Sequence, residues 1–315
     1  MGKISVIICT YNGAKRIVQT LESLYKQKLS CAEFEIIIID NGSTDNTAQV
    51  IHDFKVDHPA LTLFYHYEKQ SGKSYALNKG LQESRGEILA FIDDDVIADG
   101  NWLFAIKKAF ATTGAACLGG KVIPLWDNSC PEWLSGKASI FIPSFDWGDE
   151  IKSFTPPANF PCGTNMAFKR ELVENIGLFD VNLGHVNRKL IGSEETDYCL
   201  RIFAGGGLLI YYPKAIIYHP LNERHVSKAY LRSRSFTQGT ASAYIYAPVS
   251  KFSSLLFKKI KNISSKPDSP NKTDTPGNLF DGFYLQLKLI FYLGFLYGMV
   301  FKKIVPAQRK PLKIW

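Results

Sequence analysis

Short apolar runs alternate along the first 125 residues with segments in which apolar residues recur every three or four positions. The runs, each predicted to form a buried strand, are Ile4–Cys9, Phe34–Ile39, Leu61–Tyr65, Ile88–Ile92 and Ala116–Ile123. Between them, Ile17, Leu21 and Leu24 have the spacing of one helix face, and later segments repeat this pattern. Such alternation favours right-handed crossovers and a parallel arrangement of strands. The pattern therefore predicts an α/β fold with a Rossmann-like, mostly parallel sheet and helices on both faces.

The regular pattern fades after Trp126 and then returns. Residues 126–161 are rich in Trp, Pro and Asp, and a segment of that length inside a compact domain is typical of a functional loop or lid. The elements expected beyond it are a strand at Asn165–Lys169, a helix at Glu194–Ala204, and two short strands at Leu208–Tyr212 and Ala215–Tyr218.

Composition divides the chain into four predicted parts. They are an α/β domain at 1–225, a helical extension at 226–261, a polar, proline-punctuated linker at 262–278 and a basic tail with an apolar helix at 279–315. Residues 1–250 hold 25 Lys and Arg against 26 Asp and Glu, whereas residues 251–315 hold 12 against 3. The excess positive charge lies wholly in the tail, which favours an anionic partner such as a lipid surface. The near-neutral body gives no indication of a nucleic acid partner.

The tail contains an uncharged stretch at 289–301. A helix that crosses a membrane needs about 20 apolar residues, so this stretch favours an interfacial or re-entrant helix anchored by neighbouring lysines. A helix packed against the rest of the protein is the alternative. The six cysteines form no C-x-x-C pair, and the first apolar run is too short for a signal peptide. We therefore expect a cytoplasmic protein associated with the inner face of the membrane.

Polar residues follow three of the predicted strands at the point where each ends. Thr10-Tyr11-Asn12 follows the first strand, Asp40 the second, and Asp93-Asp94-Asp95 the fourth. Three adjacent acids require water or a hard cation to offset their repulsion. Because the carboxyl ends of parallel strands meet at one edge, these residues predict a nucleotide site there.

Lys73 lies in a segment that resembles the end of a phosphate-binding loop, Gln70-Ser71-Gly72-Lys73-Ser74. The full motif requires a glycine at the position of Tyr67, so the segment does not predict a nucleotide triphosphatase. Lys73 remains able to reach a phosphate or a base from the end of the third strand.

Several motifs, in this order, resemble those of family 2 glycosyltransferases of the GT-A fold. They are Thr10-Tyr11-Asn12, Asp40-Asn41-Gly42-Ser43-Thr44-Asp45, Gly72-Lys73-Ser74-Tyr75-Ala76-Leu77-Asn78-Lys79-Gly80, Asp93-Asp94-Asp95, Gly192-Ser193-Glu194-Glu195-Thr196-Asp197 and His219. The resemblance covers about residues 3–220. It implies metal-dependent sugar transfer from a nucleotide-sugar, expected to be a UDP-sugar, with inversion at the anomeric carbon. The implied acceptor is a saccharide or a lipid-linked molecule in polysaccharide or glycolipid biosynthesis.

The resemblance also implies roles for individual residues. Asp93-Asp94-Asp95 corresponds to the D-x-D motif, so Asp95, Asp93 and His219 are the expected ligands of Mn²⁺ or Mg²⁺. Contacts with the nucleotide-sugar are expected from Thr10, Tyr11, Asn12, Asp40, Lys73, Asn78, Asp93 and Asp94. A segment between the donor and acceptor sugars is expected at Gly163, Thr164 and Asn165.

Inverting transfer needs one general base to take the proton of the acceptor hydroxyl. Glu194 and Glu195 correspond to the family's Glu-Asp pair, whose second acid is the usual base. Here the second acid is Glu195, whose side chain is one methylene longer, so both residues remain candidates. Adjacent carboxylates raise one another's pKa, which suits a base working near neutral pH.

Two other functions fit the composition less well. A sugar-1-phosphate nucleotidylyltransferase predicts a loop rich in glycine and basic residues after the first strand, which Tyr11-Asn12-Gly13 does not resemble. A non-catalytic carbohydrate-binding module leaves the acids at 93–95 and 194–195 unexplained.

Overall fold

The structure is a computed structural model that describes residues 2–126, 134, 142–156, 159–186, 189–221, 226–246 and 280–301. The chain divides into two compact units. The larger unit contains the described residues up to 126 and from 143 to 221, and the second contains helices α7 and α9. The predicted linker at 262–278 and the basic residues after 301 lie outside the described residues.

The larger unit is built on a nine-stranded sheet in the order β3-β2-β1-β4-β8-β6-β11-β5, with β7 also paired to β11. Its strands are β1 (Ile4–Thr10), β2 (Phe34–Asp40), β3 (Leu63–Tyr67), β4 (Ile88–Ile92), β5 (Ile97–Ala98), β6 (Cys117–Trp126), β7 (Lys152–Ser153), β8 (Asn165–Lys169) and β11 (Leu209–Leu221). Strands β3, β2, β1 and β4 are parallel, as are β6 and β11, while β8 runs antiparallel between β4 and β6. This confirms the predicted mostly parallel sheet. A separate antiparallel pair is formed by β9 (Gly184–Val186) and β10 (Lys189–Ile191).

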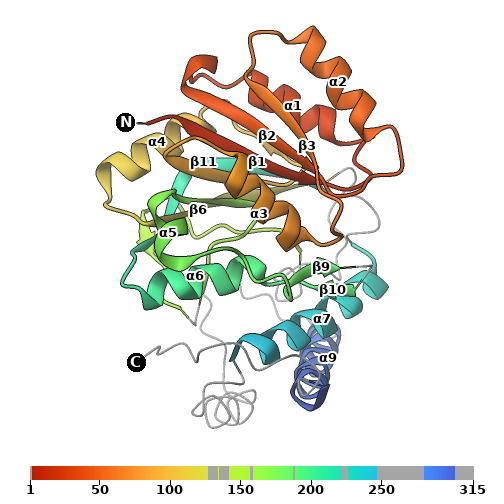
Figure 1. The fold of residues 1–315 in the computed structure, drawn as a ribbon. Helices are drawn as coiled ribbons and strands as arrows, with labels where there is room; N and C mark the ends of the chain where they lie inside the picture. The colour runs from red at the N-terminus through yellow and green to blue at the C-terminus, as the bar shows by residue number, and fades with distance from the viewer. Residues whose placement is uncertain are drawn as a thin grey trace. The chain divides into compact units, whose positions relative to one another are not determined.

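Helices cover both faces of the sheet, as the alternation predicted (Figure 1). Side chains on one face of β1, such as Val6 and Ile8, pack with α1 (Ile17–Tyr25), α2 (Thr47–Asp57) and α4 (Trp102–Thr112). Ile7, on the opposite face, packs with α3 (Lys73–Glu83) and α6 (Glu194–Ala204). Shorter helical segments are η1 (Cys31–Glu33) and α5 (Glu171–Ile176). Because the central strands are largely apolar on both sides, polar groups gather mainly at the strand ends.

Three of the predicted strands differ from those observed in ways that the local structure explains. The third begins at Leu63 because the amide of Leu61 donates to the carbonyl of His58 in the turn after α2. The two short strands predicted near residue 215 are one strand, β11, whose register with β6 shifts between Tyr212 and Ile216. A local irregularity of this kind interrupts the apolar pattern without ending the strand.

Part of the segment predicted as a loop or lid is anchored on the sheet. Phe145 pairs through its backbone with Val122 on β6. Its ring also contacts those of Trp147, Phe154 and Tyr211, the last of which lies on β11. Phe145, Trp147 and Phe154 therefore anchor this segment on the sheet, while residues 148–153 are exposed.

In the second unit, α7 (Lys228–Tyr246) and α9 (Phe280–Phe301) pack side by side and run in the same direction. The Ser235 hydroxyl donates to the carbonyl of Leu287 at 2.6 Å, and one and a half turns later Thr240 donates to that of Gly294 at 3.1 Å. A side chain at Gly239 would lie 2.0 Å from the carbonyl oxygen of Phe291. Glycines thus allow the two backbones to approach closely, as small residues do between membrane helices.

Helix α9 (Phe280–Phe301) is longer than the uncharged stretch at 289–301 from which an interfacial helix was expected. By length and composition its residues Gly282–Val300, with a mean hydropathy of 1.4, could cross a membrane, and α9 is the one such helix in the described part of the chain. The exposed side chains on α9 include Leu289, Leu293, Leu296 and Val300.

Candidate active site

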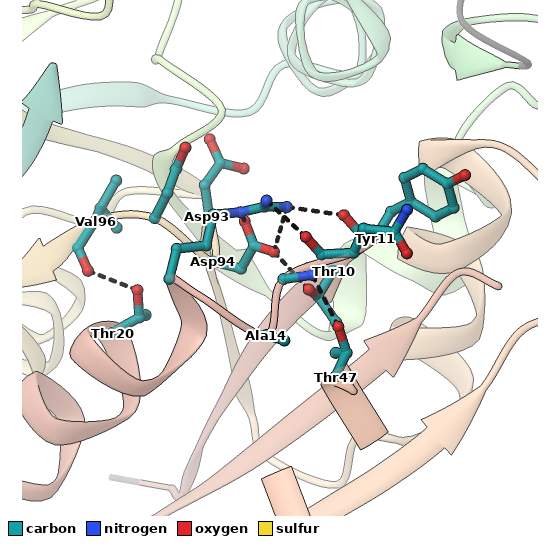
Figure 2. Close-up of polar contacts among 12 residues, drawn as sticks. Thr10, Tyr11, Ala14, Thr20, Thr47, Asp93, Asp94 and Val96 are labelled. Carbon is teal, nitrogen blue, oxygen red and sulfur yellow. Dashed lines mark hydrogen bonds and ion pairs between the residues drawn. The ribbon is translucent and has the colours of Figure 1, made fainter. Parts of the chain in front are cut away.

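Asp94, the middle acid after β4, is turned into the protein. Arg16 donates to both of its oxygens, from Nε at 2.8 Å and from Nη2 at 2.9 Å, and the hydroxyl of Thr10 donates to Oδ2. Arg16 also donates to the backbone carbonyls of Tyr11 and Asn12, each at 2.9 Å. Figure 2 shows Asp94 beside Thr10 in this network. Asp94 thus joins the turn after β1 to the turn after β4, and its contact with a nucleotide stays a prediction.

Lys73 lies among three carboxylates at the start of α3. Its Nζ is 3.4 Å from Asp93 Oδ1, 3.5 Å from Glu194 Oε1 and 2.9 Å from Glu195 Oε1. Burial by itself would lower the pKa of Lys73, but the three acids raise it well above its ordinary value. The pKa of Asp93 lies below its ordinary value despite burial, because Lys73, Thr164 and His219 favour its charged form. Lys73 therefore stays charged and ties the acids of β4 to those of α6.

Asp95 and His219, both expected as metal ligands, face one another from the end of β4 and from β11. Asp95 Oδ1 and His219 Nε2 are 3.8 Å apart, and His219 is buried. Burial, and then repulsion from Asp93, raises the pKa of Asp95 to about 6. A divalent cation beside Asp95 would offset that repulsion, and carboxylate oxygens with an imidazole are ligands that Mn²⁺ accepts. The residues fit a cation in their chemistry, although no three His, Cys, Asp or Glu side chains within the described ranges are already assembled as a metal site.

Glu194 and Glu195 begin α6 directly after Ser193, whose φ of 77° is in the left-handed region. Glu194 is 2% exposed, and burial together with Glu195 raises its pKa to about 8. Its Oε2 has no hydrogen-bond partner among the described residues. Burial thus favours the protonated form of Glu194 more than that of Glu195, whose side chain is 14% exposed.

Glu195 lies against Gly163, which the sequence placed between the donor and acceptor sugars. A Cβ added at Gly163 would be 2.3 Å from both Cδ and Oε1 of Glu195. Only glycine leaves room for the carboxylate in this position. Gly163, Glu195, Lys73, Asp93 and Cys9 line one small cavity above an apolar floor.

Three other predicted contacts have their polar groups engaged within the protein. Asp40 accepts from the backbone of Ser43 at 2.8 Å and from Tyr65 at 2.9 Å. Asn78 exchanges two hydrogen bonds with the backbone of Phe179. Asn165 accepts from Trp102 and donates to the carbonyls of Lys121 and Ala215, all at 2.9 Å. The side chain of Asn165 thus binds the scaffold, and the place of residues 163–165 between the two sugars stays a prediction.

Many of the predicted site residues lie close together. Lys73, Asp93, Asp95, Gly163, Thr164, Glu194, Glu195 and His219 gather around the end of β4. Tyr11 is 55% exposed on the neighbouring turn, where Asn12 Oδ1 accepts from the backbone of Thr44 at 2.8 Å. Arg16 was missed, because nothing in the residues around it indicates a partner 78 positions away.

Comparison with known proteins gives a consistent result. A protein-family model described as glycosyl transferase family 2 matches residues 5–177. The chain is 28% identical over 247 residues to the glucosyl-dolichyl phosphate glucuronosyltransferase of Haloferax volcanii, covering 75% of both chains. It is also 28% identical to the succinoglycan biosynthesis protein ExoM of Rhizobium meliloti, covering 78% of this chain and 75% of that protein.

Solved structures show the same fold. The mannosyltransferase PcManGT from Pyrobaculum calidifontis, in complex with GDP-Man and Mn²⁺, has a TM-score of 0.59 at 19% identity, covering 98% of this chain and 76% of that one. Residues 1–349 of TarS from S. aureus, in complex with UDP-GlcNAc, have a TM-score of 0.52 at 15% identity, covering 98% and 93%. These structures are GT-A glycosyltransferases, so the predicted fold class is confirmed.

Proposed function

The chain belongs to glycosyl transferase family 2, and we propose that it transfers a sugar, with inversion, from a nucleotide-sugar to a saccharide or lipid-linked acceptor. The observation that carries this proposal is the joining, through Lys73, of an acid at the end of β4 to the acids that begin α6. Such an arrangement places a positive charge, which can stabilise a leaving diphosphate, beside a carboxylate that can act as a base on an incoming hydroxyl.

We assign the donor side to Asp93, Asp95 and His219, which would hold Mn²⁺ or Mg²⁺. A bound cation would neutralise the charge that develops on the diphosphate as the sugar leaves. The exposed ring of Tyr11 lies on the turn that Arg16 holds, next to the same strand ends. It could stack on the nucleobase of the donor. Asp40 keeps the loop after β2 in place, and it would position the nucleobase of the donor through that loop.

We assign the general base to Glu195. Its carboxylate lines the cavity beside Gly163, whereas Glu194 is buried and holds a proton up to about pH 8. Thr164, which faces Asp93, and Gly163 then lie between the donor acids and the base. Asn165 belongs to the scaffold that places this segment.

The donor is identified by offering the purified protein a panel of UDP- and GDP-sugars, with and without Mn²⁺. We expect a UDP-sugar to be turned over, with release of UDP and no release of pyrophosphate. Asp95→Ala should abolish turnover, since the cation would lose a ligand. Turnover by Asp95→Ala that persists in EDTA would refute the metal assignment, and pyrophosphate release would indicate a nucleotidylyltransferase.

We further propose that α9 brings the enzyme to an anionic membrane surface at the cytoplasmic face, where a lipid-linked acceptor would lie. Leu289, Leu293 and Leu296 are each more than half exposed and lie three or four positions apart, so they share one face of α9. Replacing these three by Gln should reduce co-sedimentation with phosphatidylglycerol vesicles at least tenfold. The matched control replaces Leu178 and Leu208, which are 42% exposed in the larger unit, by Gln. Equal sedimentation of wild type and triple variant would contradict the proposal.

A further inference from the structure

Lys73 occupies a position that its helix alone does not favour. It is the first residue of α3, where the helix dipole is positive and a cation is destabilising. Its side chain is nonetheless only 23% exposed and reaches acids that follow β4 and begin α6. These acids are 20 and 122 residues away in the sequence. The contacts that hold Lys73 are therefore those with the site and not those with its own helix.

The Lys73 ammonium occupies one of the two oxygens of the proposed base. Its nearest partner is Glu195 Oε1 at 2.9 Å, and an oxygen that accepts a hydrogen bond from an ammonium is a poor acceptor for the proton of a hydroxyl. On its other side, Nζ is 3.4 Å from Asp93, where the proposed function places the donor diphosphate. Lysine is a point charge on a flexible stem with three donors, so it can change partners without a change in the backbone.

We propose that Lys73 switches partners during the reaction: it holds Glu195 in the free enzyme, and a bound nucleoside diphosphate draws its ammonium away and frees Glu195 for the acceptor. This inference rests on the proposed function, in which the diphosphate binds beside Asp93 and Glu195 takes the proton. Lys73 is then a positioning residue for the base as well as a ligand of the donor. The base becomes competent only after the donor has bound, which orders the two substrates.

The switch makes a thermodynamic prediction that needs no knowledge of the sugar. In the wild type, a diphosphate must compete with Glu195 for Lys73, so part of its binding free energy is spent on breaking that ion pair. Binding of UDP and of GDP, each with MnCl₂, is measured by isothermal titration calorimetry for wild type, Glu195→Gln, Lys73→Met and the double variant. Glu195→Gln should bind the preferred nucleotide about fivefold more tightly, the size of one partly exposed ion pair. Lys73→Met should bind it more weakly than wild type.

The double variant distinguishes competition for Lys73 from simple repulsion between Glu195 and the phosphates. If Lys73 is the object of the competition, Glu195→Gln has no effect once Lys73 is Met. If Glu195 merely repels phosphate, the same tightening persists in the Lys73→Met background, which would overturn the proposal. Glu194→Gln makes the same change one residue earlier, at a carboxyl 3.5 Å from Lys73, and should tighten binding less than Glu195→Gln.

Other outcomes are also decisive. An unchanged affinity in Glu195→Gln would overturn the switch even if Lys73→Met did not fold, since it needs only the first variant and wild type. Failure of both nucleotides to bind the wild type would overturn the proposed function together with the switch. Nucleotide binding without coupling between Lys73 and Glu195 would overturn the switch alone.

Discussion

Replacing Gly163 by Ala should displace Glu195 without disturbing the fold. The added Cβ would lie 2.3 Å from Cδ and Oε1 of Glu195, while ordinary contacts begin at 3.4 Å. The carboxylate must therefore retreat by at least 3.4 − 2.3 = 1.1 Å, because it is the flexible end of a side chain. A displacement of about 1 Å in a reacting group costs about 100-fold in rate, equivalent to about 2.7 kcal/mol.

The measurement is the turnover number for transfer from the donor found in the nucleotide-sugar panel, together with the thermal unfolding midpoint. We expect the turnover number to fall about 100-fold while the unfolding midpoint stays near that of wild type. Gly192→Ala is the matched control, because its Cβ would meet nothing within 4 Å and its φ is not positive. A Gly163→Ala enzyme that retains more than a third of wild-type turnover would refute the assignment of Glu195 as base.

Two further predictions concern stability. Glu194 holds a proton up to about pH 8 in the folded protein but loses it near its ordinary pKa when unfolded, so the free energy of unfolding should fall as pH rises between about 4.5 and 8. Glu194→Gln should reduce that decline and be more stable than wild type at pH 8.5. The measurement is urea denaturation of both proteins at pH 5 and 8.5. An equal fall in the free energy of unfolding for the two proteins would contradict the burial argument. Arg16→Met should cost about 1–2 kcal/mol at pH 7, less than a fully buried pair because the Arg16 side chain is 41% exposed. Lys26→Met, which removes a 72% exposed partner of Glu22, is the control and should cost less than about 0.5 kcal/mol; equal losses would show that the Asp94 contact adds nothing.

The sequence predicts the sheet well because its strands are continuous apolar runs. Ile88–Ile92 and Asn165–Lys169 have the predicted bounds, and the acids that follow Ile92 lie on the edge where the alternation placed them. It fails where one strand bends, as in β11, since an irregularity and a strand end interrupt the pattern in the same way.

Side-chain roles are harder to predict than positions. Asp94 and Asn165 lie within motifs of the site, yet one binds Arg16 and the other binds Trp102 and two backbone carbonyls. A motif gives the residue types at a strand end but not which of them face inward. That depends on partners far away in the sequence, and the ammonium of Lys73 between Asp93 and Glu195 is likewise a product of tertiary packing.

The common direction of α7 and α9 limits how this chain can meet a bilayer. If both helices crossed it, residues 247–279 between them would have to cross back, and this stretch contains Lys258, Lys259, Asp268 and Asp274. Moving such charged side chains through hydrocarbon is costly. The pair therefore does not form a two-helix transmembrane hairpin: the end of the chain either leaves through α9 to the opposite side or returns to the side from which it came. A reporter fused after Trp315 would read that choice directly, as accessibility from one compartment or the other.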